Sequence, residues 1–450
     1  MRTPRALLLL FFAALSQSVG QPPPTPEIPM PMFLEPLVLP GRDAATWLIT
    51  LTYRVDREFF VPIRNTDTSL AGQYRCMGEI LVELADSTGS SFDRQIDRVD
   101  LAENSVAPGP QERHWVQGAA SFTVPPGTYR IFFEATDTES KRRQVNKEII
   151  VRTPRKDLDG PGISGATFVE HLYPPSPDTL VLENFGGDFL FGKDRALLVG
   201  LRLPGDTSTT VDCRWSFAVM DRNNEPGTTL TPDSLLRMPL VRRTQIVLSE
   251  ATGDVRGTLH ADSTATGAFA IIPIHTALLP LRNYTLRLDL TTAQGRQTTF
   301  TRPVRAVWPE MPFSLKNVDG ALEALRFITT EGQLDSLRSG TFEQRRDALE
   351  AFWQARNRTT GTARNEVMTE YYRRVDFAIR NFGTLRIPDG SRSDRGKIFI
   401  LCGQATRTER SLNPSGGHME TWFYDHIKKK FVFVDESKTG TYTLVATAPL

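Results

Sequence analysis

The chain is poor in cysteine and histidine. Its 450 residues include three cysteines and six histidines. Cys76, Cys213 and Cys402 lie far apart, and an odd number of thiols cannot be fully paired. Small scaffolds that are held together by disulfides use many more cysteines. We therefore expect each cysteine to be a small buried residue in its own domain, with a bridge between two domains as the alternative.

Signatures of metal and nucleotide sites are also absent from the sequence. His418 and His426 are a strand's length apart, and no two histidines have the helical or turn spacing of metal ligands. The glycine pairs Gly186-Gly187 and Gly416-Gly417 are turn signals and not phosphate-binding loops. The sequence therefore predicts no metal and no cofactor.

The chain has almost no net charge. Its formal charge is +1, with 23% charged and 40% hydrophobic residues, which are ordinary globular values. A charge this small gives no long-range field that would attract nucleic acid or an acidic membrane. Basic residues are denser over residues 341–410, but acidic residues are interleaved with them, which is typical of a solvated helix surface. No nucleic-acid partner is expected.

A single long apolar run occurs, and it lies near the start of the chain. Ala6 to Leu15 is unbroken, with Arg2 and Arg5 before it and the small residues Ser18-Val19-Gly20 after it. A membrane-spanning helix needs about 20 apolar residues. Residues 1–20 are therefore predicted to be a signal peptide, followed by a mature chain that is not lipidated and has no transmembrane span. The expected location is the periplasm, the outer-membrane periphery or the extracellular space, with envelope or secreted proteins as partners.

Two β-rich regions are predicted to follow a tether. Residues 21–40 are rich in proline, which holds a chain extended and excludes a helix. Residues 41–155 and 160–308 each contain runs with a period of two residues, separated by turn signals, as in antiparallel sandwiches. The fold class that we expect is therefore multidomain, with two tandem all-β immunoglobulin-like sandwiches and an α+β C-terminal domain over residues 313–450.

One local pattern occurs in both β-rich regions. A Pro-containing turn leads into Tyr129 in the first region and into Tyr284 in the second, and each tyrosine starts an alternating strand. A tyrosine that anchors the corner before a strand is familiar from immunoglobulin-like sandwiches. The alternatives are one large sheet and a chance likeness of two hairpins.

The periodicity becomes helical after Pro312. Leu322, Leu325 and Ile328 indicate a first helix, Thr341 and Gln344 form a capping box, and a wide apolar stripe predicts a helix over residues 363–382. Four strands are predicted to form the sheet that this helix covers, over residues 397–401, 420–424, 431–435 and 442–445.

The last hundred residues carry a characteristic order of aromatic, acidic and arginine positions, which runs through Phe352-Trp353, Asn365-Glu366, Tyr371 to Arg374, Asp394-Arg395-Gly396, Glu420 to Tyr424 and Asp435. Through this order the chain resembles the bacterial GWxTD-domain family from about Leu349 to Val445. The naming motif is altered here to Gly390-Ser391-Arg392-Ser393-Asp394, with Ser391 in place of tryptophan and Ser393 in place of threonine. The family's name describes a motif and not an activity. The positions that the resemblance assigns to the family are Phe352, Trp353, Asn365, Glu366, Tyr371, Tyr372, Arg373, Arg374, Gly390, Ser393, Asp394, Arg395, Gly396, Gly403, Glu420, Trp422, Tyr424 and Asp435.

These positions are interpreted as structural. Asp394, expected just before a strand, can accept bonds from backbone amides, and Gly396 suits a turn that other residues cannot adopt. Arg374 or Arg395 could pair with Glu366 or Glu420 under aromatic cover, since charges inside a core are tolerated only when paired.

The function expected from the sequence is that of a non-enzymatic interaction or scaffold module. The alternative is a cysteine-dependent hydrolase or cross-linking enzyme that uses Cys402, His418 and Asp435, which occur in the order nucleophile, base, acid. A reactive thiol is normally placed at a helix N-terminus, whereas Cys402 is expected at the end of an apolar strand.

Overall fold

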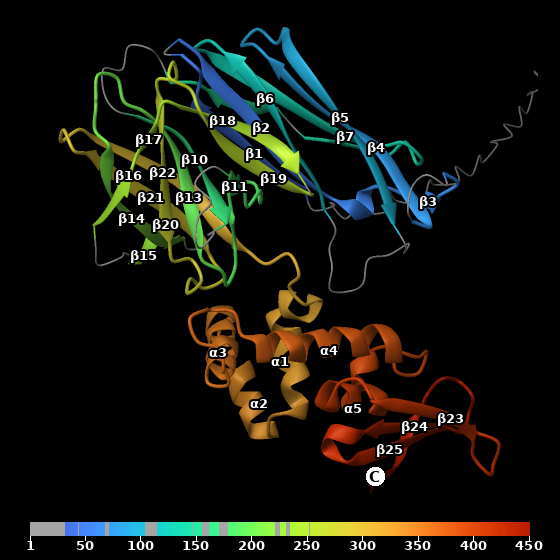
Figure 1. Ribbon diagram of the computed structural model, residues 1–450. Coiled ribbons are helices and arrows are strands. Elements are labelled where there is room, and N and C mark those ends of the chain that lie inside the picture. The colour runs from blue at the N-terminus through green and yellow to red at the C-terminus, as the bar shows by residue number, and fades with distance from the viewer. Residues whose placement is uncertain are drawn as a thin grey trace, which may run out of the picture.

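The computed structural model describes residues 32–43, 45–67, 72–103, 115–146, 148–154, 162–170, 179–220, 226–230, 235–251 and 253–450. The predicted signal peptide and the first part of the predicted tether lie outside these residues. Among the described residues most of the chain is strand, and every α-helix comes after Asn317 (Figure 1). The expectation of a β-rich chain with helices near the C-terminus is confirmed at that level.

Two facing sheets form the N-terminal β unit. One has the strand order β1-β2-β6, and the other is built around β4 and β7. The first core lies between them and contains residues such as Ile49 and Leu51 of β2 and Ile80 and Val82 of β4. The strands are β1 (Met32–Pro40), β2 (Trp47–Asp56), β3 (Ile63–Arg64), β4 (Tyr74–Ala85), β5 (Ser91–Glu103), β6 (Trp115–Val124), β7 (Thr128–Asp137), β8 (Arg143–Val145) and β9 (Ile149–Arg152), with the 3-10 helix η1 (Arg57–Phe59) after β2.

Part of the predicted tether is wrong, because residues 32–40 form strand β1. This strand pairs with β2 in continuous antiparallel register, from Met32 opposite Val55 to Pro40 opposite Trp47. Pro36 is accommodated because β1 is the edge of its sheet, where a missing backbone N–H need not interrupt a ladder. The first β unit therefore includes residues 32–40, which precede the boundary expected at residue 41.

The second β unit contains three sheets, with the orders β10-β13-β20-β17, β11-β19-β18 and β12-β22-β21-β14-β15. The second core lies between the first and the last of these, where it includes Phe168, Leu197 and Phe217, and it continues into the C-terminal helices through residues such as Leu322 and Trp353. The strands are β10 (Gly162–Glu170), β11 (Thr179–Val181), β12 (Phe189–Leu190), β13 (Arg195–Arg202), β14 (Thr210–Met220), β15 (Pro226–Leu230), β16 (Leu236–Pro239), β17 (Val241–Arg242), β18 (Thr244–Ala251), β19 (Asp254–Ala261), β20 (Gly267–Ile274), β21 (Asn283–Thr292) and β22 (Gln297–Val307).

A third hydrophobic cluster joins the two β units, and we call it the junction core. It contains Leu37 and Leu39 of β1, Leu198 of β13, Val255 of β19 and Phe269 of β20, all of them buried. Leu48 of β2 and Ala119 of β6 pack against the same cluster. The sheet β1-β2-β6 is therefore covered on both faces, which explains why nearly every residue of β2 is buried.

A buried ion pair crosses the same junction. Glu35 of β1, which is 3% exposed, accepts bonds from Thr167 Oγ1 at 2.9 Å and from Arg302 Nη1 at 3.1 Å. Arg302, on β22, also donates to the carbonyl oxygens of Ala166 and Gly187. Burial raises the pKa of the Glu35 carboxyl, and the Arg302 guanidinium opposes that rise. The buried carboxylate of β1 is thus compensated by a largely buried guanidinium of β22.

Both tyrosines of the repeated sequence pattern anchor a corner. The Tyr129 hydroxyl donates to the carbonyl oxygen of Pro125 at 2.9 Å, and the Tyr284 hydroxyl donates to that of Pro280 at 2.6 Å. In each case the acceptor lies four residues upstream, and the tyrosine ring belongs to the hydrophobic core of its unit. The predicted anchoring is confirmed at both positions.

The C-terminal part lies below the β units in Figure 1 and contains five α-helices and a sheet of order β23-β24-β25-β26. The predicted strand over residues 397–401 is wrong, because these residues belong to helix α5. The elements are η2 (Phe313–Lys316), α1 (Val318–Ala324), η3 (Leu325–Phe327), α2 (Glu331–Arg338), α3 (Phe342–Gln354), α4 (Glu366–Phe382), η4 (Gly390–Arg392), α5 (Asp394–Cys402), β23 (Arg407–Leu412), β24 (His418–Tyr424), η5 (Asp425–Ile427), β25 (Lys429–Asp435) and β26 (Thr443–Pro449).

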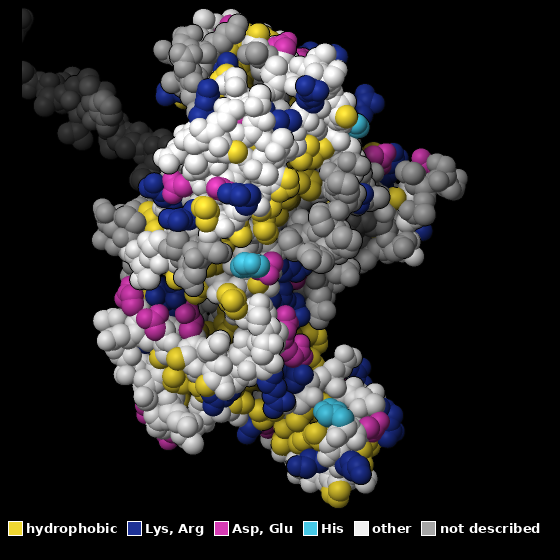
Figure 2. Space-filling view, turned by 60° about the vertical axis from the view of Figure 1, so that its left-hand side comes forward, with side chains coloured by type: hydrophobic (Ala, Val, Ile, Leu, Met, Phe, Trp, Pro, Cys, Tyr) yellow, Lys and Arg dark blue, Asp and Glu magenta, His cyan; other side chains and the backbone are white. Residues whose placement is uncertain are grey.

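The surface carries both signs of charge. Figure 2 shows basic and acidic side chains interspersed over the face in view, and hydrophobic side chains next to Lys and Arg side chains in the lower, C-terminal lobe. Within the described residues, no helix has the length and hydropathy that crossing a membrane requires.

Leu39→Ala should destabilise both β units together. Leu39 is fully buried in the junction core, and Leu→Ala changes in a core cost about 2–5 kcal/mol. Denaturant unfolding followed by tryptophan fluorescence should therefore show an earlier midpoint in one cooperative transition. Leu235→Ala, at a side chain that is 53% exposed, is the matched control and should change stability by less than about 0.5 kcal/mol. Two separate transitions, only one of them shifted by Leu39→Ala, would show that the units fold independently.

Candidate functional site

Helix α4 organises the C-terminal part, and Asn365 fixes where it begins. The Asn365 side chain accepts a bond from the Met368 backbone N–H at 3.0 Å, which caps the first turn. Its amide nitrogen donates to the Trp353 carbonyl oxygen at 2.6 Å. One buried side chain therefore joins the start of α4 to the end of α3.

Three aromatic family positions pack together behind this cap. The rings of Trp353, Tyr371 and Tyr372 lie with their centroids 5.3 to 5.7 Å apart. The two tyrosine hydroxyls donate to the carbonyl oxygens of Ala324 and Ala321, at 2.6 and 2.9 Å. These bonds satisfy carbonyl groups in and at the end of α1, so both tyrosines hold α4 against α1.

The remnant of the naming motif forms a tight turn between α4 and α5. Ser393 caps α5, because its hydroxyl accepts from the Gly396 backbone N–H at 3.0 Å and donates to the Gly390 carbonyl oxygen at 2.7 Å. A Cβ at Gly396 would lie 2.1 Å from the Gly390 oxygen, and a Cβ at Gly390 would lie 2.2 Å from the Ala378 oxygen. Gly396 is therefore required because the backbone of α5 lies against the Gly390 carbonyl group. The turn conformation expected at Gly396 is wrong, since this residue lies in a helix.

Ser391, which stands where the family's motif has tryptophan, is buried in this turn. Its hydroxyl donates to Asp389 at 2.6 Å and accepts from Arg326 Nη2 at 3.1 Å. Burial lowers the pKa of Arg326, and the nearby Arg392 adds to that shift. A small polar residue here is thus held by a partly buried arginine.

Three further family positions, Asp394, Asp435 and Gly403, are explained by their contacts with the backbone or by their own backbone conformation. Asp394 accepts the backbone N–H of Leu444 at 2.7 Å, so its predicted role as an amide acceptor is confirmed, although it opens a helix and not a strand. Asp435 accepts the Gly440 N–H at 2.7 Å and that of Thr439. Gly403 ends α5 with a φ of 79°, which favours glycine.

The other family positions on the helices make surface contacts. Arg374 pairs with Glu370 at 2.7 Å, one helical turn away, and not with Glu366 or Glu420. Glu366 pairs with Arg364, Arg373 lies 3.9 Å from Glu310, and the Phe352 ring is covered by Arg356. Exposed pairs of this kind contribute little to stability.

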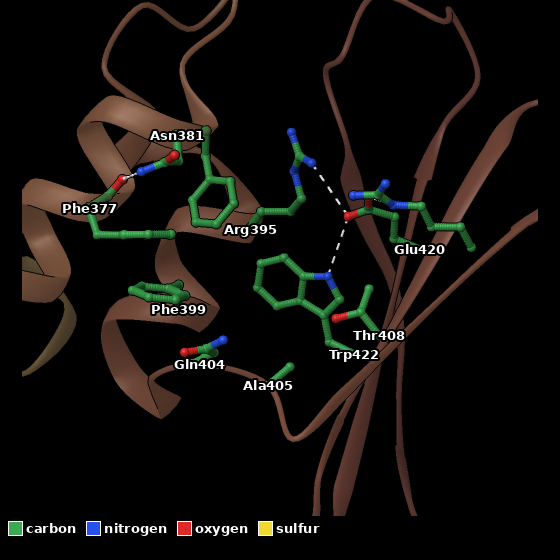
Figure 3. A pocket seen from close by; sticks show the side chains of 11 residues that line it. Phe377, Asn381, Arg395, Phe399, Gln404, Ala405, Thr408, Glu420 and Trp422 are labelled. Carbon is green, nitrogen blue, oxygen red and sulfur yellow. Dashed lines mark hydrogen bonds and ion pairs between the residues drawn. The ribbon is translucent and has the colours of Figure 1, made fainter. Parts of the chain in front are cut away.

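An open pocket of about 630 Å³ lies between α4, α5 and the strands β23 and β24 (Figure 3). Aromatic rings form much of its wall, with the Phe377 and Phe399 rings stacked at 4.3 Å between centroids and Trp422 facing Phe382 at 5.5 Å. Its lining residues are Phe377, Asn381, Phe382, Arg395, Phe399, Gln404, Ala405, Thr408, Arg410, Glu420 and Trp422.

A buried carboxylate lies at one side of the pocket. Glu420, 5% exposed, accepts bonds from Arg410 Nε at 2.9 Å, Trp422 Nε1 at 3.3 Å and Arg395 Nη1 at 3.4 Å. Arg395 also stacks on the Tyr442 ring at 4.1 Å. The expected pairing of Arg395 with Glu420 under aromatic cover is confirmed, and it forms part of a pocket.

Sequence reasoning found three residues of this pocket and missed the rest. Arg395, Glu420 and Trp422 are family positions. Phe399 is expected from the sequence only as part of the strand over residues 397–401, Arg410 only as the end of the region rich in basic residues, and Phe377 is not singled out. The sequence analysis did not predict strand β23, whose pairing with β24 places Arg410 opposite Glu420 and Thr408 opposite Trp422.

The structure does not bring the alternative catalytic residues together. His418 and Asp435 are opposite each other at one end of the pair β24 and β25. Cys402 lies at the other end, where the Tyr424 hydroxyl bonds the Gly403 carbonyl oxygen. The six residue steps from His418 to Tyr424 span about 20 Å at about 3.3 Å each. Cys402 is also the last residue of helix α5 and not its first, which corrects the strand expected there.

The three cysteines lie in separate places, but only Cys76 and Cys213 are buried as expected, since Cys402 is partly exposed. Cys76 lies in the first core, Cys213 lies in the second, and Cys402 packs against the small core under the C-terminal sheet. In the part of the chain that the structure describes, no group of three or more His, Cys, Asp or Glu side chains is arranged to hold a metal ion.

Gly396→Ala should destabilise the C-terminal part, because the new methyl group would overlap the Gly390 carbonyl oxygen. Overpacking of this kind costs about 1–3 kcal/mol, which thermal unfolding followed by circular dichroism can measure. Gly332→Ala in helix α2, where a Cβ meets nothing within 4 Å, is the matched control and should stabilise by up to about 1 kcal/mol. Equal effects of the two changes would refute the packing role of Gly396.

The Cys402 thiol should react slowly in the folded protein. Burial raises its pKa, against the opposing charges of Arg374 and Lys429, and a raised pKa leaves less of the reactive thiolate at neutral pH. Iodoacetamide labelling near pH 7 should be slower than that of free cysteine, should accelerate as the pH rises, and should be unchanged in His418→Ala. Fast labelling near pH 7 that His418→Ala suppresses would instead support a catalytic pair.

Comparisons with known proteins give one informative match. No curated protein matches the chain. Astrotactin-2, a vertebrate-specific perforin-like membrane protein, is 9% identical over 92% of this chain and 88% of its own, with a TM-score of 0.20. The C-terminal domain of the Streptococcus pyogenes antigen I/II-family protein AspA is 10% identical over 62% of this chain and 99% of its own, with a TM-score of 0.16. Red sea bream transglutaminase is 8% identical over 61% of this chain and 31% of its own, with a TM-score of 0.15.

TM-scores of 0.15 to 0.20 are too low to indicate a shared fold or function. The family model of the GWxTD domain, in contrast, matches residues 283–448. This range contains the resemblance from Leu349 to Val445 and begins earlier, at strand β21 of the second β unit. The chain therefore carries a GWxTD domain over residues 283–448.

Proposed function

We propose that this chain is an exported, non-enzymatic interaction protein of the cell envelope, and that the pocket between α4, α5, β23 and β24 is its docking site. One observation carries the proposal. The pocket is open and lined with aromatic rings, and its carboxylate and guanidinium groups are engaged with one another. Aromatic residues and arginine are enriched in protein interfaces relative to the rest of the surface.

The proposed location and partners rest on the N-terminal sequence. The basic residues, the apolar run and the small residues before Gln21 are typical of a signal peptide. Such a leader would deliver the chain to the periplasm, the outer-membrane periphery or the outside of the cell. Envelope or secreted proteins are therefore the proposed partners.

The β units are proposed to be immunoglobulin-like sandwiches that support this domain. The tyrosine corners at Tyr129 and Tyr284 support the assignment, because such corners occur in immunoglobulin-like folds. Two units joined by the junction core would form a stiff arm, which suits a protein that presents a binding domain to a partner.

A pocket variant should lose specific partners. We would express the tagged full-length chain in its native host, cross-link it, and quantify the envelope proteins that co-purify. The double variant Phe377→Ser with Arg410→Glu changes two exposed residues of the pocket. The captured amount of at least one protein should therefore fall about tenfold or more, as expected when an interface loses an anchor residue. The matched control is Phe313→Ser with Arg386→Glu, two exposed residues outside the pocket lining. Identical capture by wild type and pocket variant would overturn the proposal.

A further inference from the structure

Strand β23 leaves one edge of the C-terminal sheet open. In the described part of the chain it pairs only with β24, and all six of its residues are exposed. An open edge has backbone N–H and C=O groups that can pair with another extended chain. Figure 3 shows that this edge borders the pocket, since Thr408 lies beside Trp422 at the pocket wall.

The strand register tells which backbone groups face outward. The Asn413 N–H donates to the Gly417 carbonyl oxygen at 2.9 Å, at the turn between β23 and β24. Bonded and non-bonded residue pairs alternate along an antiparallel ladder. Ser411 and Glu409 therefore direct their backbone groups toward β24, and Thr408 and Arg410 direct theirs toward the open edge.

The same two residues have their side chains in the pocket. Thr408 is opposite Trp422 and Arg410 is opposite Glu420, and all four line it. Side chains of neighbouring strands that are opposite each other lie on the same face of the sheet. A strand added to this edge would therefore bring every second side chain over the pocket, while its backbone bonds Thr408 and Arg410.

The charged groups of the pocket indicate which kind of peptide would bind as the added strand. The pocket holds two guanidinium groups, those of Arg395 and Arg410, and one carboxylate, that of Glu420. Arg410 uses Nε for Glu420, and its side chain is 81% exposed, so its terminal nitrogens can reach an incoming carboxylate. Phe377 is 40% exposed and Phe399 is partly exposed, so these two stacked rings can contact an aromatic side chain of the peptide, with the buried Trp422 behind the pocket wall.

We propose that an extended acidic peptide adds to β23, with an aromatic side chain in the pocket and a carboxylate, two residues away, at Arg410. This inference rests on the proposed function and names the chemistry of the partner. A peptide fits better than a sugar or a small anion, because only a peptide can also pair with the outward backbone groups of Thr408 and Arg410.

The probe is a blocked, fluorescein-labelled eight-residue peptide, in which glutamate, phenylalanine and glutamate occupy alternate central positions and threonine and serine fill the rest. Binding to the full chain is measured by fluorescence polarisation. Thr408→Pro removes one outward N–H and is tolerated on an edge strand, so it should weaken binding at least tenfold. Thr408→Val keeps the N–H and should bind within about threefold of wild type. Circular dichroism and the unfolding midpoint establish that both variants are folded.

A second pair of measurements tests the charge. Arg410→Gln should weaken binding of the glutamate peptide at least fivefold and leave binding of the same peptide with glutamine unchanged. No binding by wild type, equal binding by Thr408→Pro and Thr408→Val, or equal loss of both peptides with Arg410→Gln would overturn the inference. If partner capture from the native envelope still depends on Phe377 and Arg410 while Thr408→Pro has no effect, the proposed function stands and the added strand is refuted.

Discussion

The C-terminal domain depends on helix α4, because different faces and ends of this one helix contact α1, α3, α5, the turn before α5 and strand β24. At its start Asn365 binds the end of α3, and in its first half Tyr371 and Tyr372 bind the backbone of α1. The Ala378 carbonyl, near its C-terminal end, lies against Gly390 in the turn before α5, where only glycine fits. Its last turns supply Phe377 and Phe382 to the pocket. A displacement of α4 would therefore disturb the core and the pocket together.

The stability of the pocket wall depends on a buried carboxylate that keeps its hydrogen-bond donors. Removing Glu420 from water is costly, and the cost is offset only because Arg395, Arg410 and Trp422 all donate to it. Arg410 is the exposed member of this group. A partner's carboxylate could approach Arg410 without breaking the Glu420 network, because a guanidinium has five N–H donors. The same residues can therefore have a structural role and a binding role, whereas from the sequence these positions are interpreted as structural.

The sequence predicts those features that depend on local patterns. The alternating strands, the capping box of Thr341 and Gln344 and both tyrosine corners appear where expected. The apolar run of α5 contains β-branched residues and reads as a strand, but the Ser393 cap and the terminal Gly403 make it a helix. Most of the pocket wall could not be foreseen, because it depends on how α4 and α5 cross the strands. The polar sequence of β23 gives no periodic signal of a strand.

The second β unit also determines how the pocket is held. The segment before α4 is fixed to it, because the Ala363 N–H donates to the Ala277 carbonyl oxygen at 2.7 Å and the Thr362 hydroxyl donates to that of Gly192 at 2.8 Å. Arg282, next to the second tyrosine corner, forms two bonds with Glu350 of α3. The start of α4 is therefore attached to the β units, while its end forms the pocket. A force or a displacement applied at the pocket would pass along α4 into the stacked sheets, whose junction core resists their separation.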